Sequence, residues 1–140
     1  MRIGVLLAVI LVSACSTEPQ APLVATDVVV TRPVPGMQMS AAYLSLTNHT
    51  DETIRISRVV STQYESVQLH ESIVKDGVAR MRAIPVLEIP AGETITLQRG
   101  GKHLMLMQPT GAAESVSLQF LDGDNLVLAV DATLKPKTTR

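Results

Sequence analysis

Residues 102–108, Lys-His-Leu-Met-Leu-Met-Gln, place leucines alternately with a histidine and two methionines. Successive side chains of a β-strand point to opposite faces of the sheet. This stretch therefore predicts a strand with Leu104 and Leu106 on one face and His103, Met105 and Met107 on the other. Because leucines favour the core, we expect a β fold in which the histidine and the methionines lie away from the leucine face.

The rest of the chain repeats this pattern of short strands. β-branched or alternating runs are separated by turn residues such as Asp76-Gly77, at a spacing of about 8 to 12 residues. No stretch has a convincing long helical period. The pattern predicts an all-β, single-domain antiparallel sandwich or barrel. The expected strands cover residues 26–31, 41–48, 53–60, 66–71, 79–82, 94–98, 102–108, 115–121 and 125–134.

Residues 1–14 predict an export signal of the lipoprotein type. Arg2 precedes a short apolar run that ends in small residues. This run is far shorter than the roughly 20 residues that a membrane-spanning helix needs. Residues 12–15, Val-Ser-Ala-Cys, resemble a bacterial lipobox, whose cysteine is acylated and becomes the first residue of the mature protein. The alternative is an ordinary signal peptide cleaved after Ala14, which would leave a free thiol at Cys15.

The lipobox predicts a protein of the bacterial periplasm that is tethered to a membrane through lipidated Cys15. Residues 15–22 are polar and contain prolines, which suits a flexible tether. Ser16 follows the cysteine, and by resemblance to the sorting rules of Gram-negative lipoproteins a residue other than Asp there favours the outer membrane. The folded domain is expected over residues 23–134, followed by a polar tail over residues 135–140.

Composition excludes several classes of function. Cys15 is the only cysteine, so the domain has neither an internal disulfide nor a thiolate metal ligand. The formal net charge of −1, with no basic stripe, argues against nucleic-acid binding. No Gly-x-Ser-x-Gly or His-Glu-x-x-His motif is present, so we do not expect an enzyme. Few aromatic residues occur, and the core is expected to be built of Val, Leu, Ile and Ala.

Two histidines and two methionines form the candidate metal site. His70 is followed after ten residues by Met81, and Met81 after twenty-one residues by His103, with Met105 next but one. Imidazole and thioether together favour Cu(I) over Mg²⁺ or Ca²⁺, which need oxygen ligands, and over zinc. The alternative is that these methionines are ordinary packing residues and the histidines ordinary core or surface residues.

Three further methionines are candidate accessory residues. Met37 and Met39 have the Met-x-Met spacing of copper-handling segments and could assist entry of the ion. Met107 shares the ligand face, where we expect it to pack beside the site. Glu71, next to His70, is expected to orient or solvate the site, because a hard carboxylate adds little to Cu(I).

The spacing His-x10-Met-x21-His-x-Met resembles the signature of the PCu(A)C (PCuAC) family of periplasmic copper chaperones. The resemblance covers roughly residues 28–134 and includes Leu-His-Glu at 69–71 and Gly-Lys-His-Leu-Met-Leu-Met at 101–107. It implies a cupredoxin-like Greek-key sandwich or barrel and one Cu(I) held by His70, Met81, His103 and Met105. It also implies delivery of copper to the CuA centre of cytochrome c oxidase, with its copper subunit and Sco-like proteins as partners.

Two other functions remain open at this point. The chain could sequester copper for copper tolerance, or it could be a lipid-anchored β-sandwich interaction module that binds no metal. Some family members carry a His- and Met-rich C-terminal extension, whereas residues 134–140 contain neither residue type. A second copper site in the tail is therefore not predicted.

Overall fold

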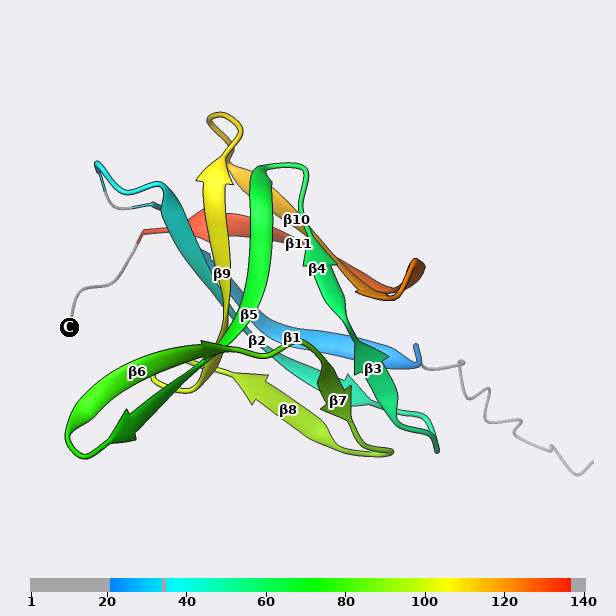
Figure 1. Ribbon diagram of the computed structural model, residues 1–140. Coiled ribbons are helices and arrows are strands. Elements are labelled where there is room, and N and C mark those ends of the chain that lie inside the picture. The colour runs from blue at the N-terminus through cyan, green and yellow to red at the C-terminus, as the bar shows by residue number, and fades with distance from the viewer. Residues whose placement is uncertain (1–20, 34, 137–140) are drawn as a thin grey trace, which may run out of the picture.

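The computed structural model describes residues 21–33 and 35–136, in which every regular element is a β-strand (Figure 1). The eleven strands are β1 (Leu23–Thr31), β2 (Met39–Asn48), β3 (Ile54–Ile56), β4 (Arg58–Val60), β5 (Tyr64–Lys75), β6 (Val78–Ala83), β7 (Leu87–Ile89), β8 (Thr94–Leu97), β9 (Lys102–Pro109), β10 (Ser115–Asp122) and β11 (Asn125–Lys135). The predicted signal segment, Cys15 and residues 137–140 of the predicted tail lie outside the described residues. Within the described part, no helix is long and apolar enough to cross a membrane.

Seven strands close into a barrel. Neighbouring strands follow the order β1-β11-β10-β4-β5-β9-β2, and β2 pairs with β1 to complete the ring. β1 and β11 run parallel, with Val30 opposite Leu134, and the remaining pairs of the ring are antiparallel. β8 adds to β2, β6 adds to β5, and β3 and β7 form a separate two-stranded sheet. The predicted all-β fold is confirmed.

The structure differs from the sequence prediction at three strands. The expected strand over residues 53–60 is interrupted at Ser57, where β3 turns to pair with β7 while β4 pairs with β5 and β10. The backbone N–H of Ser57 donates to the carbonyl of Leu121 at 2.9 Å, which fixes this break. β7 itself was not predicted, because three residues between prolines are too short to show a period. β5 runs to Lys75 rather than ending at Glu71, because its end pairs with β6.

The predicted alternation on β9 is confirmed. Leu104 and Leu106 are fully buried in the barrel, whereas Met105 and Met107 are half-buried on the opposite face. Each leucine of this kind contributes about 1.5–3 kcal/mol through burial of its side chain. The hydrophobic effect therefore fixes which face of β9 carries the candidate ligands.

The core is mostly aliphatic, as expected, but it also takes two of the three aromatic residues. Phe120 and Tyr64 are buried, and the Tyr64 hydroxyl lies 2.8 Å from the hydroxyl of Ser40, so its polar end is satisfied inside the barrel. The buried hydrophobic cluster of the described residues runs from Leu23 to Leu134. A chain that begins at Ser16 therefore keeps this whole core.

The end of β5 and all of β6 form a hairpin that extends from the barrel (Figure 1). Its two-residue turn is Asp76-Gly77, with φ values of 54° and 74°. Positive φ at both central residues matches a type I′ turn, whose twist suits an antiparallel hairpin. Every residue of β6 is exposed. Backbone pairing with β5, rather than burial, thus holds this strand.

Candidate metal centre

Three neighbouring strands bring the four predicted ligands to one face of the sheet. His70 on β5 lies directly opposite His103 on β9, with ring centroids 6.1 Å apart and ring planes at 90°. Met105 shares the face of His103, two residues further along β9. Met81 on β6 pairs with Ser72, which shares the face of His70 on β5. Residues separated by long gaps in the chain thus form one cluster.

Met81 already lies against His70. The Sδ atom of Met81 is 3.2 Å from Nδ1 of His70. A tetrahedral ion with bonds of about 2.0 Å to nitrogen and 2.3 Å to sulfur, the lengths found in zinc sites, separates those two donor atoms by about 3.5 Å. The observed pair is therefore close to the separation that a shared metal ion requires.

Each imidazole has a hydrogen-bond partner on the ring nitrogen that points away from the proposed ion. Nε2 of His70 lies 3.0 Å from the side-chain oxygen of Gln68, and Nδ1 of His103 lies 3.0 Å from the carbonyl oxygen of Gly101. The carbonyl oxygen of Gly101 can only accept, so Nδ1 of His103 carries a proton and its Nε2 has the lone pair in the neutral ring. With the side-chain oxygen of Gln68 as acceptor, His70 takes the tautomer with its proton on Nε2 and its lone pair on Nδ1, facing Met81.

Gln68 and Gly101 are two residues that the sequence prediction missed. A hydrogen-bond acceptor behind a ligating histidine fixes its tautomer and orientation. Gln68 is also the register partner of Met105 on β9, so it stands between two predicted ligands. The only signal in the sequence is its parity with His70, which follows two residues later.

The pKa of His70 favours the neutral imidazole, which is the form that can bind a metal ion. Partial burial, and then the neighbouring His103, lower the pKa of the His70 imidazole from its ordinary value. The neutral form, which has the lone pair, thus persists to lower pH than in an exposed histidine. His103 is only 6% exposed, so solvent reaches the cluster mainly from the side of Met81, which is 53% exposed.

Glu71 points to the opposite face of β5 from His70 and ties the three strands together. Its carboxylate accepts from Nε and Nη2 of Arg82 on β6, at 3.0 and 2.7 Å, and from Nζ of Lys102 on β9 at 3.0 Å. These hydrogen bonds, first that of Arg82 and then that of Lys102, lower the pKa of the Glu71 carboxyl. Glu71 therefore supports the strands that carry the ligands rather than pointing at the cluster.

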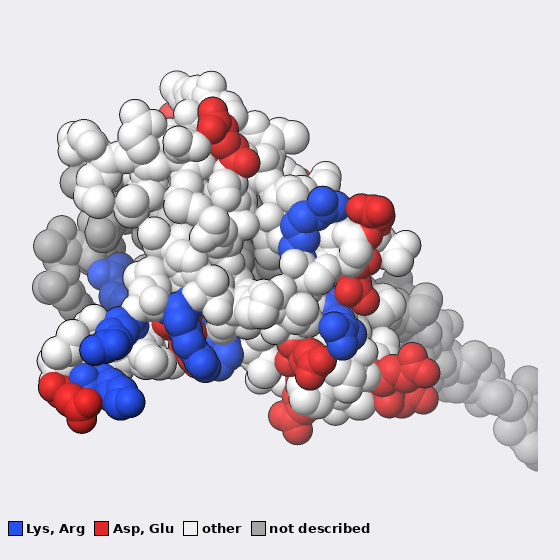
Figure 2. All heavy atoms as spheres, in the orientation of Figure 1, with Lys and Arg blue, Asp and Glu red and all other residues white. Residues whose placement is uncertain are grey.

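The donors available in the cluster are soft or borderline. Among residues 21–33 and 35–136, no group of three or more His, Cys, Asp or Glu side chains is placed to hold a metal ion. In Figure 2, Lys and Arg lie over the β6 hairpin, at the lower ends of β5 and β9 and, beside acidic side chains, over β3 and β4, while most of the surface over β5 and β9 is uncharged. Any metal held by this cluster depends on the thioethers, and neutral ligands of this kind suit Cu(I).

The accessory methionines separate into two places. Met39 on β2 lies directly opposite Met107 on β9, one pleat along from Met105. Met37 lies in the turn before β2 and lines a different hollow, together with Pro109 and Gly111. Sheet register thus groups Met39 and Met107 with the cluster and does not group Met37 with it.

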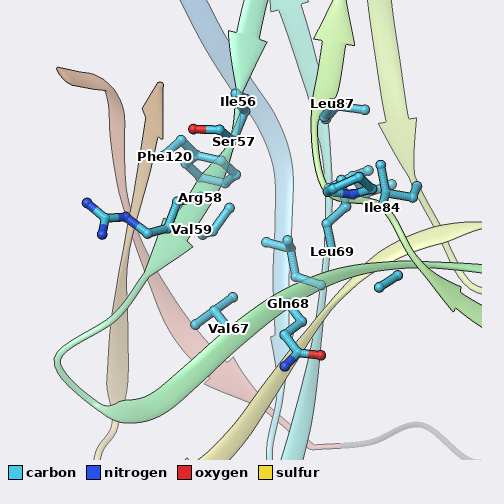
Figure 3. A pocket seen from close by; sticks show the side chains of 14 residues that line it. Ile56, Ser57, Arg58, Val59, Val67, Gln68, Leu69, Ile84, Leu87 and Phe120 are labelled. Carbon is cyan, nitrogen blue, oxygen red and sulfur yellow. The ribbon is translucent and has the colours of Figure 1, made fainter. Parts of the chain in front are cut away.

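An apolar cavity of about 240 Å³ lies on the inner side of β5 (Figure 3). It is lined largely by aliphatic and aromatic side chains, among them Val67, Leu69 and Phe120. Gln68, whose side-chain oxygen lies 3.0 Å from Nε2 of His70, also lines the cavity. None of the four predicted ligands lines it, so the cavity meets the surroundings of the His/Met cluster only at Gln68.

Comparisons with known proteins agree with this architecture. Residues 23–132 match the profile of a protein family described as "Putative lipoprotein LpqE-like". A curated relative from Leifsonia xyli subsp. xyli (strain CTCB07), "Putative lipoprotein Lxx21020", is 38% identical over 101 residues, which are 68% of this chain. The aligned region spans 61% of that relative's length.

Solved structures share the fold. The copper-bound PCuAC domain from PmoF2 superposes with a TM-score of 0.67 at 16% identity, over 85% of this chain and 97% of that domain. CuI-DR1885 from Deinococcus radiodurans is 32% identical, with a TM-score of 0.61 over 89% of this chain and 84% of that protein. Apo-DR1885 has 30% identity and the same TM-score over 98% and 95% of the two chains. The predicted cupredoxin-like fold of PCu(A)C proteins and the predicted family resemblance are confirmed.

Proposed function

Because the chain belongs to the LpqE-like lipoprotein family and has the fold of a PCuAC domain, we propose that it is a copper(I) metallochaperone. In this proposal one Cu(I) is held by Nδ1 of His70, Nε2 of His103 and the thioethers of Met81 and Met105. The protein then passes the ion to a partner by ligand exchange, without catalysing a reaction of its own.

The observation that carries this proposal is the convergence of the four side chains from β5, β6 and β9. Their sequence separation makes chance clustering on one face implausible, and the 3.2 Å between Met81 and His70 suits two donors to one ion. The copper described in the PmoF2 domain and in DR1885 supports copper as the cargo.

The donor set also supports transfer rather than permanent storage. Two imidazoles and two thioethers are neutral, so they leave the positive charge of Cu(I) uncompensated. Met81 is the most exposed of the four, at 53%, and lies on a strand outside the barrel. We propose that Met81 is the first ligand to be replaced by a donor from the acceptor protein.

We further propose a location and a destination. Lipidated Cys15 would hold the domain at the periplasmic side of a membrane, a proposal supported by the lipoprotein descriptions of the family and of the Leifsonia relative. The acceptor proposed from the family resemblance is the copper subunit of cytochrome c oxidase at its CuA centre, with Sco-like proteins acting alongside.

An anaerobic Cu(I) titration against a competing chromophoric chelator tests the copper site. The parent is the chain from Ser16 to Arg140, and the test variant is Met81→Ala/Met105→Ala. Met37→Ala is a matched control, because Met37 is 48% exposed and lies outside the cluster. One tight equivalent in the parent and the control, strongly weakened in the double variant, is the expected result. No stoichiometric binding in the parent would leave a β-barrel interaction module as the better description.

Transfer to an acceptor separates a chaperone from a sequestering protein. The loaded chain is mixed with the soluble copper domain of a cytochrome c oxidase subunit, and the copper in each protein is measured after separation. We expect copper to move to the acceptor. Retention of copper by the loaded chain, with an acceptor shown to take free Cu(I), would favour copper tolerance as the function.

A further inference from the structure

We propose that Met39 and Met107 form a second, weaker thioether site for Cu(I), from which the ion passes along β9 to the four-ligand cluster. This inference rests on the proposed function, since it describes how cargo enters the same site. It concerns two residues that lie outside the His-x10-Met-x21-His-x-Met pattern.

Sheet register places the two thioethers together. Met39 on β2 is the direct partner of Met107 on β9, as Ala41 is of Met105. Directly opposite residues in an antiparallel pair have Cβ atoms about 4.5–5.5 Å apart. Methionine has an unbranched side chain with three rotatable bonds, so both sulfur atoms can reach one ion between them.

The strand end that carries this pair is fixed by an additional hydrogen bond. Gln108 has a φ of 55°, and its backbone N–H donates to the carbonyl of Gln38 at 2.8 Å. This contact joins β2 and β9 one residue beyond the pair, at the end where β2 starts and β9 ends. The position of Met39 opposite Met107 is therefore held by the backbone and needs no side-chain packing.

The surroundings of the pair favour a soft monovalent ion. The neighbours on the same face of β2, β9 and β5 include Ala41, Ser66 and Gln68, none of which is charged. Thioethers bind Cu(I) well and hard cations poorly, and none of these three neighbours is a carboxylate that would attract hard cations. Met39 is 39% exposed, so an incoming ion can reach it from solvent.

The pair also leads to the cluster. On one face of β9 the order is Met107, Met105, His103, and each step between them is about 6.8 Å along the strand. Met105 lies between Met107 and His103, and its side chain can turn toward either of them. It can therefore take the ion from Met107 before His103 and His70 complete the coordination. Each step replaces one coordinate bond by another, and the copper remains Cu(I) with no transfer of electrons.

Methyl NMR of the chain from Ser16, labelled with [methyl-13C]methionine and titrated anaerobically with Cu(I) as its acetonitrile complex, tests this order. The first equivalent should shift the methyl signals of Met81 and Met105, and the second should shift those of Met39 and Met107. Met37, which is similarly exposed, is the internal control and should not move. Signals of Met39 and Met107 that stay unchanged at two equivalents would overturn the second site.

A volume-conserving variant tests the transfer role. Met39→Leu/Met107→Leu removes both sulfurs while keeping apolar volume, and Met37→Leu is the matched control. We expect the double variant to lose the second equivalent, to keep the affinity of the first, and to acquire Cu(I) from a chelator at least about threefold more slowly. An unchanged acquisition rate would overturn the relay.

The two proposals fail separately. If Met39 and Met107 respond while Met81 and Met105 do not, the four-ligand site and the relay to it are wrong, and only the thioether pair stands. If only Met81 and Met105 respond, the copper site of the proposed function stands and the second site is wrong.

Discussion

The barrel and the β5–β6 hairpin both supply proposed ligands to the cluster, but different forces hold them. His103 and Met105 lie on β9, whose other face carries the fully buried Leu104 and Leu106. Met81 lies on β6, where every residue is exposed and pairing with β5 provides the order. One part of the site is fixed by the hydrophobic core, and the other by a hairpin with almost no core.

This difference suits the proposed function, in which the protein holds an ion and then releases it. Ligands on the barrel keep their positions because moving them would disturb packed side chains. A ligand on an exposed hairpin can separate without exposing the core. The comparison predicts that stability and metal affinity depend on different residues, and the changes below test this from the largest expected effect to the smallest.

Phe120→Ala should have the largest effect on stability. Phe120 is fully buried, and truncating such a residue typically lowers the free energy of unfolding by about 3–5 kcal/mol. Val78→Ala on the exposed hairpin is the control and should change it by less than about 0.5 kcal/mol. Urea unfolding followed by circular dichroism measures both. Similar losses of unfolding free energy in the two variants would mean that hairpin side chains stabilise the fold as much as core side chains do, which would contradict the comparison.

Met81→Ala should reverse this balance between stability and affinity. Loss of a group that merely supports a metal ligand costs about 10–100-fold in affinity, so loss of the ligand itself should exceed about a hundredfold. The unfolding free energy should change by less than about 0.5 kcal/mol, because Met81 is exposed. Competition titration and urea unfolding of the same preparation give both numbers. Unchanged affinity would remove Met81 from the ligand set.

Gln68→Leu should weaken Cu(I) binding by about 10–100-fold while leaving every predicted ligand in place. The reason is that Nε2 of His70 loses the acceptor that keeps the lone pair on Nδ1. Gln119→Leu, an exposed glutamine on β10, is the matched control. The 15N shifts of the His70 ring report the tautomer directly. A variant with normal affinity and an unchanged tautomer would show that Gln68 plays no positioning role.

Acidification should have an effect no larger than that of Gln68→Leu. Protons compete with the metal for each of the two imidazoles, so affinity should fall by about tenfold between pH 7.5 and 5.5 for each imidazole with an ordinary pKa near 6.5. The pKa of His70 is lowered, so His70 stays neutral to lower pH and contributes less to this fall than an ordinary histidine would. Competition titrations across this pH range measure it. Flat affinity down to pH 5 would argue against histidine ligation.

The sequence predicts those strands in which core-facing and outward-facing side chains alternate regularly. Leucines and methionines alternate on β9 because the core lies on one side only, and the structure places them accordingly. Where alternation fails, the prediction fails too. Ser57 and Arg58 are consecutive exposed residues between the buried Ile56 and Val59, and at that point one expected strand becomes β3 and β4.

The supporting residues of the site could not be predicted in the same way. Gln68 and Gly101 act through hydrogen bonds to the two imidazoles, and neither belongs to a recognisable spacing. The pairing of Met39 with Met107 depends on the register of β2 against β9, which joins distant parts of the chain. The register between distant strands is set by the closed barrel, so no short segment of the sequence predicts it.

Because of the Asp76-Gly77 turn, the number of residues between His70 and Met81 decides where Met81 lies along β5. With that turn fixed, β6 runs back along β5 one residue at a time, so position 81 falls opposite Ser72 and position 82 opposite Glu71. One residue inserted between Val78 and Met81 would carry the thioether to the face of Arg82 and Lys102, away from both imidazoles. Two inserted residues would restore the face and move the sulfur about 6.8 Å along the strand, to the position opposite His70 that Ala83 now holds. The length of this segment therefore decides on which face of β6 the thioether lies and which residue of β5 it faces.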